Sequence, residues 1–200
     1  MNDQPSDRLL ALAAARGVIR ARDALAHGIA SIYLTRLVAD GRLERVARGV
    51  YVLPGSGLGS GTALAIVASR IPGAVVCLGS ALQFHELSTW VPGEVWIAVT
   101  SARRPPRVDW PPLHVVWVKP ALLEFGVEER VVDGVPVRLT TPARTVADCF
   151  KWRSRVGMDI ATEALRSFLQ SRQGSRDELR SHAERLRVAH VMRPYLEAMT

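Results

Sequence analysis

The sequence predicts an α+β fold built from two unlike halves. Residues 8–55 contain three short helical patterns followed by two short strand patterns, and a stretch rich in glycine and serine, residues 54–61, comes next. Beyond this stretch, segments rich in valine and isoleucine alternate with helical patterns, which is typical of an α/β domain with a mixed sheet. We therefore expect one domain over residues 1–55 and a second, with a helical C-terminal end, over residues 62–200.

The third helical pattern, residues 32–39, is the most informative element of the first half. Ser31 precedes it and is a good N-cap candidate, because its hydroxyl can accept a free backbone N–H. At helical spacing, one side of this helix is apolar and should face the core, and it carries Leu34, Leu37 and Val38. The opposite side should face outward, and it carries Ile32, Thr35, Arg36 and Ala39, with Tyr33 at its flank.

Two strand patterns, residues 43–46 and 50–53, follow this helix and flank a tight turn at Arg48-Gly49. Helices followed by such a hairpin form the layout of a winged helix-turn-helix, which places one helix in the DNA major groove and the hairpin beside the backbone. We therefore expect the DNA-binding residues to be Ser31, Tyr33, Thr35, Arg36, Arg42, Arg45 and Arg48.

The wing arginines allow two interpretations. A planar guanidinium can bind a phosphate through two hydrogen bonds, so these residues suit contacts to the DNA backbone. Arginines on a hairpin can also be a solvated face. Their position directly after a candidate recognition helix favours the phosphate contact.

The charge of the chain fits a polyanionic partner without proving one. The formal net charge is +7 and the pI is about 10.4. Residues 16–55 hold seven arginines against Asp23, Asp40 and Glu44, a modest +4 for a DNA-binding segment. We therefore expect a monomer or weak dimer that binds double-stranded DNA tightly only through dimers or cooperation between adjacent sites.

Cysteine usage and hydropathy suggest a compartment. Cys77 and Cys149 are isolated, without a CxxC motif, which favours a reducing compartment and no zinc site. The sequence shows neither an apolar run near eighteen residues nor an apolar signal-peptide core at its start. We expect a cytoplasmic protein with no membrane partner.

The second half should alternate helices and strands. Strands are expected over residues 74–78, 94–100, 113–118, 127–132 and 135–139. Helices are expected over residues 62–70, from Ser80 through Leu87, for about ten residues from Pro142, and over residues 159–171 and 177–200. Asp133-Gly134 is a strong hairpin signal, and Thr141-Pro142 supplies an N-cap and a first helical position.

The second half shows no catalytic constellation. It lacks GxxxxGK[ST], GxGxxG before a helix, HExxH and GxSxG, so we expect no enzyme activity, no cofactor and no metal. Ser80 and His85 could pair, but a helix cap and a helix residue are favoured. Arg144 and Asp148 lie four residues apart, which favours a buried ion pair that fixes a helix on the sheet over a catalytic role.

Three segments together resemble the AbiEi antitoxin family: RGVY at residues 48–51, the helix from Ser80 to His85, and TPARTVAD at residues 141–148. The similarity covers residues 8–150, with the segments in the same order. AbiEi proteins are antitoxins of AbiE-type, or type IV, toxin–antitoxin systems. The resemblance implies an N-terminal domain that binds DNA and represses its own operon. It also implies a C-terminal domain that counteracts a toxin of the nucleotidyltransferase type.

A basic loop and four tryptophans complete the set of candidate contacts. The loop carries Arg103, Arg104 and Arg107 with two prolines, so it is either solvated or a second contact to DNA or to an acidic partner. Most of Trp90, Trp96, Trp110 and Trp117 should be core. Trp110, between Asp109 and two prolines, is the one expected to be exposed as an interface anchor.

These observations favour an antitoxin and autoregulatory transcriptional repressor. Two alternatives stay open. One is a solitary winged-helix regulator whose C-terminal domain binds a ligand or dimerises, and an adjacent nucleotidyltransferase reading frame would argue against it. The other is a DNA-targeted nuclease, which a metal-dependent cleavage assay would reveal.

Overall fold

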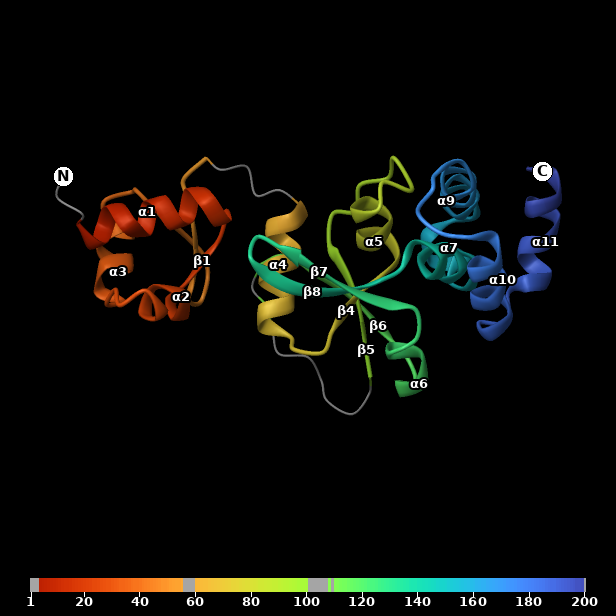
Figure 1. Cartoon of the computed structure of the whole chain (residues 1–200), viewed down its shortest axis with the longest axis horizontal. Coiled ribbons are helices and arrows are strands. Elements are labelled where there is room, and N and C mark those ends of the chain that lie inside the picture. Colours follow the sequence, from red (N-terminus) through yellow and green to blue (C-terminus); the bar gives the residue numbers. More distant parts are fainter. Residues whose placement is uncertain (1–3, 56–59, 101–107, 109, 200) are drawn as a thin grey trace.

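The structure is a computed structural model that describes residues 4–55, 60–100, 108 and 110–199. Figure 1 shows three groups of elements along the longest axis: helices α1 to α3 at one end, a larger sheet in the middle and helices α9 to α11 at the other end. Helices and strands are mixed in both sheet-containing parts, and the larger sheet has both parallel and antiparallel pairs. The predicted α+β class is confirmed.

The N-terminal part has the element order of a winged helix. Its elements are α1 (Pro5–Arg16), β1 (Ile19–Arg20), α2 (Ala21–Ala26), α3 (Ile32–Ala39), β2 (Glu44–Ala47) and β3 (Val50–Val52). The strands form an antiparallel sheet in the order β1-β3-β2. α1 ends where Gly17 takes a φ of +70°, which a residue without a Cβ adopts at little cost. Leu9, Leu34, Leu37 and Leu43 fill the centre of this part and are almost completely buried.

The larger sheet has five strands in the order β6-β5-β4-β8-β7. These are β4 (Val75–Val76), β5 (Val95–Val99), β6 (Leu113–Trp117), β7 (Val127–Val132) and β8 (Val135–Thr140). β5 pairs with β6 and β4 with β8 in parallel, whereas β4–β5 and β7–β8 are antiparallel. The predicted hairpin signal is confirmed, because Asp133 and Gly134 join β7 to β8 with φ values of +48° and +70°.

Helices pack on this sheet and also form the C-terminal end of the chain. They are α4 (Ser60–Arg70), α5 (Leu78–Phe84), α6 (Pro120–Leu123), α7 (Pro142–Lys151), α8 (Arg153–Val156), α9 (Met158–Gln170), α10 (Arg176–Arg185) and α11 (Ala189–Ala198). Thr141 caps α7 as predicted, since its Oγ1 accepts a hydrogen bond from the Arg144 backbone N–H at 3.4 Å.

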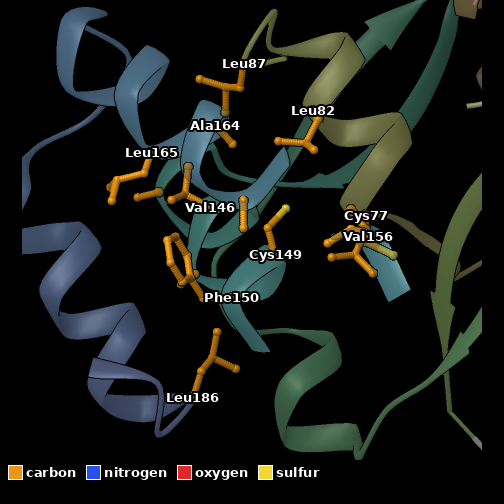
Figure 2. Packing of buried hydrophobic residues seen from close by; sticks show 14 of the residues in the cluster. Cys77, Leu82, Leu87, Val146, Cys149, Phe150, Val156, Ala164, Leu165 and Leu186 are labelled. Atoms are coloured by element: carbon orange, nitrogen blue, oxygen red, sulfur yellow. The ribbon is translucent and has the colours of Figure 1, made fainter. Parts of the chain in front are cut away.

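Successive residues of the central strands point to opposite faces of the sheet, and each face has its own core. Val76, Ile97 and Val99 pack with residues of α4 in one cluster. Val75, Trp96 and Ala98 pack with α7 and α9 in the other. Figure 2 shows the second cluster, in which Phe150 of α7 lies among side chains from α9 and from Leu186. β5 is therefore buried over its whole length.

The C-terminal helix expected over residues 177–200 is two helices, so that prediction is wrong. α10 ends at Arg185, and Arg187 takes a φ of +59° before α11 begins. The Val188 N–H returns to the Ala183 carbonyl at 2.8 Å, which closes the first helix. This turn buries both Leu186 and Val188 in the core. The burial of these two side chains therefore outweighs the helical propensity of the sequence at this point.

The strand expected over residues 74–78 is also shorter than predicted. Cys77 is extended, but it already forms the N-cap position of α5, and Leu78 is the first residue of that helix. The chain therefore leaves the sheet after Val76. The two short helices α6 and α8 lay within segments for which the sequence predicted no element.

The N-terminal part contacts the larger sheet through α4. Val18, Val50 and Val52 form a buried cluster with Ile66 of α4, and Trp110 packs against it. The Arg70 guanidinium donates a hydrogen bond to the backbone carbonyl of Arg48, at the wing turn. The expected linker, residues 54–61, includes residues 56–59, which lie outside the described ranges.

Two tryptophans are placed differently from the prediction. Trp110 is half-buried at this contact and is not an exposed anchor. Trp117, which was expected in the core, is 47% exposed. Its strand β6 is an edge strand, and its position in the strand order was not visible in the sequence.

Candidate nucleic-acid interface

The candidate recognition helix α3 presents the two faces that helical spacing predicted. Leu34 and Leu37 are almost completely buried, and Val38 is half-buried against the same cluster. The outward residues are all exposed: Ile32, Thr35, Arg36 and Ala39. The apolar face fixes α3 on the N-terminal core and leaves a mixed polar face in solvent, where a DNA groove can reach it.

Ser31 does not act as the predicted side-chain cap. Its own backbone is helical, with φ −60° and ψ −20°, and its side chain accepts no hydrogen bond from the start of α3. Helical hydrogen bonding begins one residue earlier, because the Tyr33 N–H donates to the Ala30 carbonyl at 3.1 Å. Ser31 is exposed at the end of the helix.

Arg36 is the long hydrogen-bond donor of the outward face. Its guanidinium carbon lies 5.6 Å from the centre of the Tyr33 ring. A cation over an aromatic ring is held weakly, by about 0.5–1 kcal/mol at an exposed site. Tyr33 is half-buried against the core of this part, so it places Arg36 beside α3 without consuming the guanidinium's donors.

The wing is a bulged hairpin. Arg45 lies opposite Tyr51 and Ala47 opposite Val50, so Val46 has no partner across the hairpin. Gly49 takes a φ of +75° in the turn, which agrees with its expected role there. Bulges increase the local twist of a strand, and they re-aim its side chains.

The three wing arginines differ in their partners. Arg45 and Arg48 are exposed, and neither guanidinium forms a hydrogen bond or ion pair with a described residue. Arg42 Nη2 lies 3.4 Å from Asp7 Oδ1, with both side chains about half exposed, at 51% and 57%. An exposed pair of this kind contributes about 0–1 kcal/mol, but it occupies Arg42 and places a carboxylate beside it.

Two arginines of interest were missed in the sequence. Arg22 lies at the start of α2 and is exposed, and the helix before the recognition helix is the one that crosses the DNA backbone in this motif. Arg70 lies on α4, yet its guanidinium holds the carbonyl of the wing turn. The helical pattern of residues 22–26 could have indicated Arg22. The contact of Arg70 depends on the tertiary fold alone.

Ser80 and His85 do not form a catalytic pair. Ser80 lies inside α5, so its predicted role as a cap is wrong, and its Oγ accepts the Trp96 backbone N–H at 2.9 Å. His85 Nε2 lies 2.7 Å from the Thr140 carbonyl, to which it donates. Both side chains are buried and both join α5 to the sheet.

The surroundings of His85 disfavour its protonated form. Burial lowers the pKa of His85, and this effect outweighs the hydrogen bond to Thr140 and the nearby carboxylate of Glu128, which raise it. A neutral imidazole that donates from Nε2 to a carbonyl suits a structural role.

Arg144 and Asp148 form the predicted buried ion pair. Arg144 Nε donates to Asp148 Oδ2 at 2.7 Å, and the side chains are only 4% and 6% exposed. Arg144 Nη1 also donates to the carbonyls of Phe125, at 2.6 Å, and Leu122, at 3.3 Å. The pair therefore ties α7 to α6 and to the segment that follows it.

Burial also acts on the acid of this pair. It raises the pKa of Asp148, although the charge and hydrogen bond of Arg144 act in the opposite direction. The cysteine thiols nearby are buried too, and burial raises the pKa of both Cys77 and Cys149. Neither sulfur is in a disulfide.

The remaining expectations concern the basic loop, a metal site and a membrane-spanning helix. The basic loop of Arg103, Arg104 and Arg107 lies outside the described residues. Among the described residues, no three His, Cys, Asp or Glu side chains gather as they would around a metal ion. No described helix combines the length and the apolar character needed to cross a membrane.

Comparison with known proteins bears on the N-terminal part. A search of curated proteins gave no match to the chain. A family model described as "Transcriptional regulator, AbiEi antitoxin" matches residues 7–54, from α1 through the wing. The winged-helix part of this chain therefore matches the AbiEi antitoxin family of transcriptional regulators, the family that the sequence resembles.

Proposed function

We propose that this protein is an antitoxin and the autoregulatory repressor of a type IV toxin–antitoxin operon. The observation that carries the proposal is the exposed face of α3, together with exposed wing arginines, in a segment that matches a family of transcriptional regulators. Thr35 and Arg36 read base edges in the major groove of the operator. Arg45 and Arg48 contact phosphates beside it.

The small number of available cations limits how tightly one copy binds. Arg45 and Arg48 can meet phosphate directly, whereas Arg42 first has to leave Asp7. Nonspecific affinity for DNA grows with the number of phosphates that a protein neutralises, so one winged helix alone binds weakly. Two copies on half-sites about one helical turn apart, roughly 34–36 Å, provide the operator affinity.

The part beyond the wing counteracts a nucleotidyltransferase-like toxin by binding or by indirect opposition, without turnover. The residues that the sequence offered as catalytic candidates are engaged in structural contacts. Arg144 pairs with Asp148, and Ser80 and His85 form hydrogen bonds to the backbone of the sheet. Residues 151–200 carry ten basic side chains against six acidic ones. The net positive charge of this segment suits an acidic partner.

A pair of assays separates the two roles in the full chain. Arg36→Ala should lose repression of an operator–reporter fusion, yet still protect cells that express the neighbouring nucleotidyltransferase. Arg130→Ala, on the exposed edge of β7, is the matched control and should keep both activities. Loss of protection together with repression in a folded Arg36→Ala protein would contradict the division of roles.

The full chain is used because the proposed domains, residues 1–55 and 62–200, share a buried contact. A fragment starting at residue 62 would expose Ile66, which packs against Val50 and Val52. A truncated protein could therefore fail through poor folding. Point variants in the full chain avoid this ambiguity.

One observation favours the second candidate, a solitary regulator that responds to a ligand. A cavity of about 260 Å³ lies between α4, α5 and the chain around Trp110. Trp110 also packs against the cluster that joins the wing to α4, so a ligand there would touch the contact between the two parts. A gene neighbourhood without a nucleotidyltransferase, with operator affinity that changes on ligand binding, would support this candidate.

A further inference from the structure

A second cavity, of about 210 Å³, lies at the end of the edge strand β6, against the C-terminal half of α7. It takes no part in the proposed contacts to DNA. Its lining includes Trp117 at the end of β6, Lys119 just before α6, Leu122 of α6, Lys151 at the end of α7, and Trp152 just after it. Beneath them lies the buried ion pair of Arg144 and Asp148.

The charge of this cavity suits an anion. Lys119 and Lys151 are the only lysines of the sequence, which has 26 basic residues, and both line it. Asp148 compensates Arg144, so the two ammonium groups leave the lining with a charge of about +2. Lys151 Nζ donates to the Leu186 carbonyl at 3.3 Å, and Lys119 is exposed. A lysine ammonium is a compact charge that binds phosphate well.

The two indoles supply flat apolar surface. Trp117 is 47% exposed at the last position of β6. Trp152 is half-buried, and the Arg155 guanidinium lies 4.7 Å from its ring centre. Indole faces bind planar aromatic rings by stacking, with little dependence on the identity of the ring.

The floor of the cavity is fixed before any ligand arrives. The Arg144 guanidinium donates to Asp148 and to the carbonyls of Leu122 and Phe125, so its position is set by several bonds. A site that is already ordered loses less conformational freedom on binding. The cavity, of about 210 Å³, opens to solvent at Trp117 and Lys119, so a ligand larger than this volume can bind with part of it outside.

We propose that this cavity binds a nucleoside monophosphate. The base stacks on the indoles of Trp117 and Trp152, and the phosphate lies between Lys119 and Lys151. Recognition needs both features, because the indoles offer no cation and the ammonium groups offer no flat surface. The site is separate from α3 and the wing, so its occupancy does not depend on the proposed binding of DNA.

Isothermal titration calorimetry with the full chain tests this site. The probes are AMP, GMP, CMP and UMP, with the parent nucleosides and inorganic phosphate as separate arms. We expect at least one monophosphate to bind with a Kd between about 10 µM and 1 mM. The nucleoside and the phosphate alone should each bind at least about tenfold more weakly.

Variants at exposed positions assign the binding. Lys119→Glu reverses one charge and Trp117→Val keeps a residue that suits a strand, and each should raise the Kd about tenfold or more. Lys119→Gln provides a milder change if the reversal lowers the melting temperature. Arg130→Ala, at the opposite edge of the same sheet, should bind like the unaltered protein.

Four results would overturn the proposal. They are no binding of any monophosphate, equal binding of inorganic phosphate alone, unchanged Kd values in folded Lys119 and Trp117 variants, and loss of binding in Arg36→Ala. The last result would place the nucleotide on the DNA-binding face. Because these readouts involve neither operator nor toxin, the proposal can fail or hold independently of the proposed function.

Discussion

Arginine has opposite surroundings in two regions of this molecule. In the wing, the Arg45 and Arg48 side chains lie in solvent and bond to no described residue. At the start of α7, Arg144 is buried and bonds to a carboxylate and two carbonyls. The difference teaches that burial and partners decide whether a cation is available to a ligand or is fixed in the fold, because desolvation makes an unpaired buried charge very costly.

The same contrast extends to the charge of whole segments. Residues 1–55 carry eight basic side chains against five acidic, and residues 151–200 carry ten against six. Residues 56–150, which form the larger sheet, carry eight of each. Several of the cations in this middle segment pair within it, as Arg138 does with Glu124. The net charge of +7 therefore belongs to the two ends of the chain.

The largest expected effect comes from the buried arginine. Arg144→Ala should lower the free energy of unfolding by about 3–5 kcal/mol, because it leaves the Asp148 carboxylate and the Phe125 carbonyl without their partner. Chemical denaturation monitored by circular dichroism measures the change. The pair of Arg130 and Glu128, whose side chains are 58% and 23% exposed, is the control, and Arg130→Ala should cost less than about 1 kcal/mol. If the two variants lose similar free energies of unfolding, the distinction between buried and exposed arginines is wrong.

The next largest effect concerns base reading. Arg36→Ala should weaken operator binding by about 1–3 kcal/mol and relax the sequence preference, since it removes the long donor of the outward face of α3. Fluorescence anisotropy with operator and scrambled duplexes measures both quantities. The free energy of unfolding should change little in this variant, because the Arg36 side chain is exposed. Equal operator affinity in the variant and the original protein would show that α3 does not read this position.

A smaller effect is expected in the wing, where it should differ among the arginines. Replacing Arg45 or Arg48 with alanine should weaken binding to all sequences and reduce the salt slope of log K by about one unit. Arg42→Ala should change the slope less, because Arg42 is already paired with Asp7. If all three variants give the same slope as the original protein, the wing lies away from the DNA backbone.

The smallest effect is a dependence of stability on pH from two buried histidines. Burial lowers the pKa of both His85 and His182 below the ordinary value of 6.5. The unfolded chain therefore binds more protons than the folded one below about pH 6.5. The contribution of the neutral imidazoles is complete above that pH and is lost as the pH falls through the folded pKa values.

Melting curves between about pH 7.5 and 5.5 measure this contribution. His85→Gln and His182→Gln should each lower the pH dependence of Tm relative to the original protein. The raised pKa of Asp148 acts in the opposite direction, but it is common to all three proteins and drops out of the comparison. If the curves of Tm against pH are parallel for all three proteins, the histidines are not the source of the pH dependence.

Local patterns predicted much of the fold. Helical spacing placed Leu34 inside and Arg36 outside α3, and Asp133-Gly134 marked the hairpin between β7 and β8. The i,i+4 spacing of Arg144 and Asp148 predicted their ion pair. Each of these features depends on residues within one element or one turn, so the sequence alone contains the necessary geometry.

The errors concern tertiary neighbours. Ser80 has the chemistry of a cap, but the chain bends into α5 three residues earlier and turns its hydroxyl toward Trp96. Trp110 was predicted to be exposed and Trp117 to be buried, and both predictions are wrong. The packing of the wing against α4 and the edge position of β6 decide their burial, and both follow from the assembled fold. The two lysines that line one cavity are 32 positions apart, and no local pattern connects Lys119 to Lys151.

The shared cluster of the wing and α4 limits how this protein can be re-engineered. Val50 and Val52 are among the residues that build the wing hairpin, and Ile66 and Arg70 of α4 cover and anchor that hairpin. A chimera that transplants residues 1–55 onto another regulator would leave an apolar patch open to solvent and the wing turn without its anchor. A transferable winged-helix module from this chain must therefore extend through α4, or replace the two valines with polar residues.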